Sequence, residues 1–201
     1  MKATAALVAA LSILAAPLAA QRVRFSPQIG LYIPTERLYD LASGNHGEDF
    51  QIEAGPSFAA RLGFRFGRRL GIDIGGSYVP TTFKFGSGAT TKENAKLFIG
   101  SGQLDLFLIP PTSPLSLFLS GGVAAISRGG VAFTNEAKTT NVGGVFGVGA
   151  GINLGPLALT AVADLVTYKA DYQGTQVVSQ ELRQKDVNLK FGFGIPFGGG
   201  R

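Results

Sequence analysis

The residues best suited to acid–base chemistry lie together in one polar segment. His46 is the only histidine among the 201 residues, and it stands close to Glu48 and Asp49. A histidine acts as a general base when a serine nucleophile is held within hydrogen-bond reach. Ser43 is near in sequence alone, and a metal site needs more imidazole or a tighter carboxylate cluster. We therefore expect a solvated loop here, and we expect no enzyme, no metal and no cofactor.

The amino-acid composition excludes several further kinds of site. The chain has no cysteine, which excludes a thiol nucleophile, a disulfide framework and a cysteine zinc site. Its net charge of +5 is small and scattered, whereas nucleic-acid binding needs a basic stripe. Charged residues make up 15% of the chain and hydrophobic residues 45%, while soluble domains carry about a quarter charged residues. This balance indicates that part of the surface does not face water.

The C-terminal segment 186–197 shows where that surface lies. Successive side chains of a β-strand leave by opposite faces. One face of this segment is wholly apolar and carries Val187, Leu189, Phe191, Phe193, Ile195 and Phe197. The other face is small or charged. The pattern is typical of a strand with lipid on one side and a narrow polar lumen on the other.

Seven earlier segments repeat this alternation. They span about 23–33, 55–66, 70–78, 98–108, 115–125, 142–154 and 157–166. Each is about ten residues, the length that a tilted strand needs to cross the hydrocarbon. We therefore predict an all-β protein, a closed eight-stranded antiparallel up-and-down transmembrane β-barrel.

The connections between these segments alternate between long and short. The four long connections are predicted as loops at about Thr35–Glu53, Thr81–Lys96, Ser127–Thr140 and Asp171–Gln184. Outer-membrane barrels have long external loops and short periplasmic turns. A soluble lipocalin-like barrel, which would bind an apolar ligand, is the inside-out alternative. The glycine, alanine and serine of the second face favour the membrane.

The N-terminus predicts export from the cytoplasm. A basic start, Met1-Lys2, is followed by an apolar run from Ala5 to Leu18 and by small residues suited to cleavage. We expect a cleaved signal peptide over residues 1–20 and a barrel domain over 21–201. A membrane anchor is the poorer alternative because the run is shorter than the roughly 20 residues of a spanning helix.

The charges that face the lumen are the main candidate site. They comprise four of each sign: Arg24, Arg61, Arg65, Lys190, Asp73, Asp105, Asp164 and Asp186. A lone buried charge costs several kcal/mol, so these residues are expected to pair. Because side chains fill the interior of an eight-stranded barrel, we predict a salt-bridged plug. The alternative is a narrow channel for ions or small solutes, which opens when the pairs exchange.

The signal peptide, the eight alternating strands and the Phe-rich last strand resemble the small eight-stranded outer-membrane barrels of Gram-negative bacteria. This group includes the membrane domain of OmpA and the OmpX and Opa type proteins, and the resemblance covers essentially the whole mature chain. It implies that the last strand is an assembly signal, carried by Leu189, Phe191, Phe193, Ile195 and Phe197. The family usually ends on an aromatic residue, whereas residues 198–201 follow here.

The predicted function is a structural or adhesin-like surface role in the cell outer membrane. Binding would reside in the four long outer loops. The expected partners are outer-membrane lipids, lipopolysaccharide, the barrel assembly machinery, and a surface or envelope partner of the loops.

Overall fold

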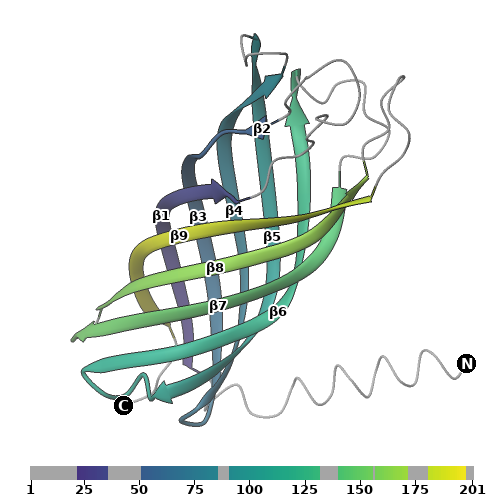
Figure 1. The fold of residues 1–201 in the computed structure, drawn as a ribbon. Helices are drawn as coiled ribbons and strands as arrows, with labels where there is room; N and C mark the ends of the chain where they lie inside the picture. Colours follow the sequence, from purple (N-terminus) through teal and green to yellow (C-terminus); the bar gives the residue numbers. More distant parts are fainter. Residues whose placement is uncertain are drawn as a thin grey trace, which may run out of the picture.

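The computed structural model describes residues 22–35, 51–85, 91–131, 140–155, 157–171 and 181–197. The predicted signal peptide and His46 lie outside the described residues. Within them, eight long strands form a barrel and a ninth strand has two residues (Figure 1). The strands are β1 (Arg22–Pro34), β2 (Gln51–Ile52), β3 (Gly55–Phe66), β4 (Leu70–Phe85), β5 (Thr91–Ile109), β6 (Leu115–Gly130), β7 (Thr140–Leu154), β8 (Leu157–Asp171) and β9 (Glu181–Phe197).

The barrel is closed and its strands are strongly tilted, as Figure 1 shows. Every neighbouring pair is antiparallel, and β1 pairs with β9 to complete the ring. A path of paired residues that starts at Val23 passes once round the barrel and returns to Ile33, ten residues further along β1. Such a stagger gives a strand tilt of roughly 40°. The predicted fold class is confirmed.

The apolar faces of the strands point outward. Large side chains with half or more of their surface exposed occur on strands all round the barrel, among them Ile29, Phe58, Leu104, Phe146 and Phe191. A soluble protein rarely exposes so large a continuous apolar surface, whereas a transmembrane barrel presents it to lipid. The lipocalin-like alternative is wrong because it needs these residues inside.

The strands are longer than predicted, at 12 to 19 residues instead of about ten. The extra length lies at the end that carries the long connections, called the outer end below. The segment Thr81–Lys96 was predicted as a loop, yet β4 and β5 stay paired as far as Phe85 and Thr91. Beyond the lipid the outward face of this hairpin is polar, with Lys84, Lys92 and Asn94, so the apolar alternation of the outer surface is lost. Inward residues such as Phe83 and Ala95 stay buried, and the backbone pairing continues.

Parts of the other three predicted loops also belong to strands. β6 continues to Gly130, β8 ends at Asp171, and β9 begins at Glu181. β2 lies within the first predicted loop and pairs with β4 at Lys84 and Phe83. The part of the outer end that the structure describes is therefore built from strand extensions.

The opposite end, called the turn end below, has the short connections that were predicted. Gly67 and Gly155 adopt the left-handed conformation there, with φ of 67° and 69°, which favours glycine because it has no Cβ. The turn before β6 is closed by a 3.0 Å hydrogen bond from the Ser113 amide to the Pro110 carbonyl. Among the described residues, no helix is long and apolar enough to cross a membrane.

Candidate functional site

Six of the eight predicted lumen charges form one buried group, named here the central charge cluster. Its members are Arg61, Arg65, Lys190, Asp73, Asp105 and Asp164. They come from β3, β4, β5, β8 and β9, and every side chain is less than a tenth exposed. Three cations thus meet three carboxylates inside the barrel.

Arg65 joins two of the carboxylates on one side of the lumen. Its Nη1 donates to Asp73 Oδ1 at 2.9 Å and to Asp105 Oδ2 at 3.0 Å. The guanidinium carbon Cζ lies 4.7 Å from the centroid of the Phe107 ring, a distance at which a cation is attracted to the ring face. Arg65 therefore ties β3 to β4 and β5.

Asp164 joins two cations on the other side. Its Oδ2 accepts hydrogen bonds from Arg61 Nη2 and from Lys190 Nζ. Arg61 Nη1 also lies 3.5 Å from Asp73 Oδ2. The bond from Arg61 to Asp164 links β3 with β8, two strands that are not neighbours in the sheet. The cluster therefore runs across the lumen as well as around its wall.

Arg24 lies beside the central charge cluster, within electrostatic range of Arg65, Asp73 and Asp105, whereas Asp186 lies apart from it. Arg24 is half-buried on β1, where a Cβ added to Gly194 would come within 2.6 Å of its Cδ. Asp186 Oδ2 accepts a 2.8 Å hydrogen bond from the Tyr168 hydroxyl nearer the outer end. Seven of the eight predicted residues thus lie in or beside the central charge cluster, and Asp186 lies nearer the outer end.

A second polar group lies near the outer end around Arg128. Arg128 Nη1 donates to Asn141 Oδ1 at 2.7 Å, and its Cζ lies 5.1 Å from the Tyr168 ring centroid. Asn141 Nδ2 in turn donates to the Lys169 carbonyl at 2.7 Å. The sequence prediction missed Arg128 because it lay in a predicted loop. The alternation of the strand could have placed Arg128 in the lumen, because it follows the inward residues Ala124 and Ile126 at the same two-residue spacing.

Apolar side chains surround this second group, which corrects the prediction of a polar lumen. They are named here the outer apolar cluster: Tyr32, Ile52, Val79, Phe83, Ala95, Leu97, Ile99, Ala124, Ile126, Val145, Val166 and Tyr168. Each is at most 8% exposed. Several of them come from strand extensions that were predicted as loops, so their inward phase was not considered.

A smaller apolar group lies on the turn-end side of the central charge cluster. The rings of Phe107 and Phe118 are 5.4 Å apart between centroids, and Val162 is buried with them. Phe107 follows Asp105 by two positions, and Val162 precedes Asp164 by two, so each lies one step nearer the turns. This inner apolar layer and the outer apolar cluster enclose the charges between them.

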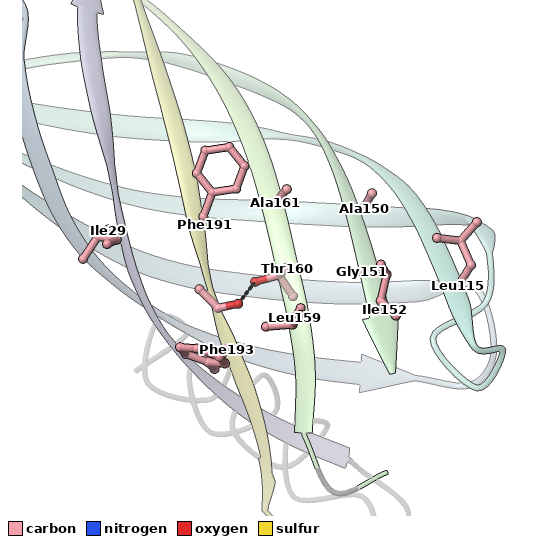
Figure 2. Close-up of a pocket in the computed structure, with 11 residues that line it drawn as sticks. Ile29, Leu115, Ala150, Gly151, Ile152, Leu159, Thr160, Ala161, Phe191 and Phe193 are labelled. Atoms are coloured by element: carbon pink, nitrogen blue, oxygen red, sulfur yellow. Dashed lines mark hydrogen bonds between the residues drawn. The ribbon is translucent and has the colours of Figure 1, made fainter. Parts of the chain in front are cut away.

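The outer wall of the barrel carries an apolar groove of about 440 Å³ (Figure 2). Small residues such as Ala150 and Ala161 lie between larger walls that include Ile29, Leu115 and Phe191. The groove opens on the lipid-facing side and contains no ionisable residue. It offers a surface for lipid chains and no catalytic group.

The predicted assembly strand lies along this groove. Phe191 and Phe193 line it, and Leu189, Ile195 and Phe197 share their outward phase on β9. In the part of the chain that the structure describes, no three histidine, cysteine or acidic residues gather as metal ligands.

The structure is thus a closed barrel of tilted strands. Its outer faces are apolar, and its strands extend beyond the apolar belt at the outer end. The family described as "Outer membrane protein beta-barrel domain" matches residues 6–197. The chain belongs to this family. Its predicted membership of the small outer-membrane barrels is confirmed, and its place is the outer membrane. No curated protein matches the chain.

Solved structures share the fold at low sequence identity. The outer membrane protein OprG from Pseudomonas aeruginosa is 10% identical, with a TM-score of 0.63 over 89% of this chain and 96% of that chain. Neisserial surface protein A is 12% identical, with a TM-score of 0.58 over 88% and 97%. Outer Membrane Protein W from E. coli is 14% identical, with a TM-score of 0.54 over 87% and 97%.

Proposed function

We propose that this protein is a closed outer-membrane barrel with a structural and surface-interaction role. Its working surface is the outer end, where strand extensions present polar residues beyond the lipid. The observation that carries this proposal is the hairpin formed by β4 and β5, which stays paired to Phe85 and Thr91.

The filled lumen supports a role at the surface of the barrel and argues against transport of ions or solutes through the lumen. The central charge cluster crosses the interior, and apolar side chains cover it on both sides. An ion would have to displace paired charges and then enter an apolar region, and each step costs several kcal/mol. A narrow channel remains the competing function.

The hairpin is held in place by Glu53, next to β2. Its amide donates to the Thr82 carbonyl at 2.9 Å, and its carbonyl accepts from Thr81 Oγ1 at 2.6 Å. Its carboxylate forms an ion pair with Lys84 and lies 3.7 Å from Lys92 Nζ. The hydrogen bond from Lys84 holds the pKa of Glu53 below its ordinary value. A braced hairpin is a suitable platform for a partner because it loses little conformational freedom on binding.

Photocrosslinking in intact cells tests the surface role. A photoreactive residue would replace Lys92 or Asn94, both exposed near the outer end, and Arg68 in an exposed turn at the other end would be the control. We expect adducts with a surface partner from Lys92 and Asn94 and a different pattern from Arg68. Identical patterns from both ends would contradict a surface role.

Export and assembly complete the proposal. We propose that residues 1–20 are removed as a signal peptide, so that the mature protein begins at Gln21. We also propose that the outward residues Phe191, Phe193 and Phe197 serve as the signal for the barrel assembly machinery, and that the protein has no enzymatic activity. Intact mass measurement of the membrane protein tests the cleavage site, and an unprocessed mass would contradict it.

A further inference from the structure

The tight turn between β3 and β4 carries two arginines at the turn end of the barrel. Gly67, with its φ of 67°, lets the chain reverse over three residues. Arg68 and Arg69 complete this turn, and both side chains are exposed. The Arg69 carbonyl accepts a 2.8 Å hydrogen bond from the Phe107 amide, which ties the turn to β5. The two cations are therefore held at a fixed place beside the wall of the barrel.

This turn directly borders the lipid-facing surface. Phe66 and Leu70 are paired with each other on either side of the turn, and Leu70 is also paired with Leu106 on β5. All three side chains point outward and are between 37% and 58% exposed. The short turns of outer-membrane barrels face the periplasm. The two arginines therefore lie at the depth of the phospholipid head groups in the periplasmic leaflet.

The part of the chain that the structure describes places no carboxylate beside these two arginines. Neither side chain forms a hydrogen bond or an ion pair with another described residue. The three short connections, 67–69, 110–114 and 155–156, contain no acidic residue. On the neighbouring strands, Asp73 and Asp105 are buried within the central charge cluster. The positive charge of the turn is therefore available to an anion from outside the chain.

The exposed cations of the β4–β5 hairpin at the outer end differ in this respect. Lys84 and Lys92 are paired directly across the ladder, and the carboxylate of Glu53 contacts both of them. The chain thus supplies the anion for that pair of cations. Arg68 and Arg69 repel each other unless an anion from another molecule lies between them.

We infer that Arg68 and Arg69 bind the head group of an anionic phospholipid in the periplasmic leaflet. Arginine suits this ligand because its planar guanidinium donates paired, charge-assisted hydrogen bonds to phosphate oxygens. A lipid is favoured over a soluble phosphate because Phe66 and Leu70 place acyl chains directly beside the turn. The inference goes beyond the proposed function, which concerns the opposite end of the barrel.

Tryptophan fluorescence in lipid nanodiscs tests this inference at the turn itself. The chain contains no tryptophan, so L70W reports from a single site beside the arginines. F98W is the matched control, because Phe98 is also exposed on the lipid-facing side but lies nearer the outer end. The quenchers are brominated phosphatidylglycerol and brominated phosphatidylcholine, each diluted into unlabelled phosphatidylcholine. The ratio of the two quenching efficiencies measures the preference for the anionic lipid at each tryptophan.

Two charge variants in the L70W background assign the preference to the arginines. R68Q/R69Q removes both charges of the turn, and K92Q/K96Q removes two exposed charges at the outer end. L70W should prefer the anionic lipid by about 25-fold, at about fivefold for each arginine. R68Q/R69Q should reduce this preference to within about twofold, and K92Q/K96Q should leave it unchanged. A heat-dependent shift in SDS gels verifies that each variant is folded.

Absence of a preference at L70W, a preference that survives R68Q/R69Q, or an equal preference at F98W would overturn the inference. Inorganic phosphate, added at matched ionic strength, should leave the quenching unchanged. Loss of the preference in phosphate would also overturn the inference, because a soluble anion would then be the ligand. The nanodisc contains no surface partner. Failure of the crosslinking experiment would therefore leave this inference standing, and the reverse also holds.

Discussion

Two parts of the same lumen are filled in opposite ways. The central charge cluster holds its strands together through directional bonds, such as those from Arg61 and Lys190 to Asp164. The outer apolar cluster fills the lumen by packing, with Leu97, Val79 and Tyr32 fully buried. A bond network fails when one member is removed, whereas a packed cluster loses stability in proportion to the volume removed. The two regions should therefore respond differently to substitution.

The largest effect is expected from D164N in the central charge cluster. It leaves Arg61 and Lys190 buried without the carboxylate that both contact, and breaking a buried pair in this way costs about 3–5 kcal/mol. Urea titration in lipid vesicles, read from the folded band on unheated SDS gels, measures the loss. The double variant D164N/K190M restores the charge balance and should recover part of it. A change below about 1 kcal/mol for D164N would remove the distinction between the two regions.

The outer apolar cluster should show a purely steric loss. L97A removes a fully buried side chain, and large-to-small substitutions of this kind cost about 2–5 kcal/mol, a range that begins below the one for D164N. The same titration applies, with L104A as control because Leu104 is 66% exposed on the lipid-facing side. An equal loss in both variants would show that Leu97 does not fill the lumen.

Packing in the inner apolar layer can be tested at Gly149. A Cβ at this position would overlap the Phe118 ring, whereas a Cβ at Gly102 would meet no atom within 4 Å. Overpacking of this kind costs about 1–3 kcal/mol. G149A should therefore lower the urea midpoint, and G102A should leave it nearly unchanged. Equal urea midpoints for the two variants would contradict the position of the Phe118 ring against Gly149.

The smallest effect is expected at the exposed ion pairs of Glu53. E53Q should cost less than about 1 kcal/mol, because exposed pairs contribute little. The folded state lowers the pKa of Glu53 through Lys84, so its stabilisation is present above the ordinary carboxyl pKa. It is lost as the pH falls through the lowered value. The difference between wild type and E53Q should vanish in acid, and a difference that grows in acid would contradict the pairing.

The sequence predicted the barrel because lipid imposes a strict alternation on each strand. It did not predict the strand ends, since β4 and β5 continue beyond the lipid with polar residues on their outward face, while inward residues such as Phe83 and Ala95 are buried. Arg128 and much of the outer apolar cluster were missed for the same reason. A strand extension whose outward face is polar resembles a loop in its sequence.

The alternation of each strand predicted which charged residues face the lumen, but it did not predict which of them form ion pairs with each other. Arg61 and Asp164 are 103 residues apart in the chain. Their contact depends on the stagger and closure of the sheet, which no local pattern contains. The phase likewise could not separate Asp186, which bonds Tyr168, from the carboxylates of the central charge cluster.

The most direct test of a closed lumen is a planar-bilayer recording of the folded wild-type protein. Both regions of the lumen are filled by side chains, so we expect no discrete conductance steps. D164N and L97A serve as comparisons, since each weakens one region. Discrete steps in the wild-type recording would contradict the closed lumen and would support the channel in its place.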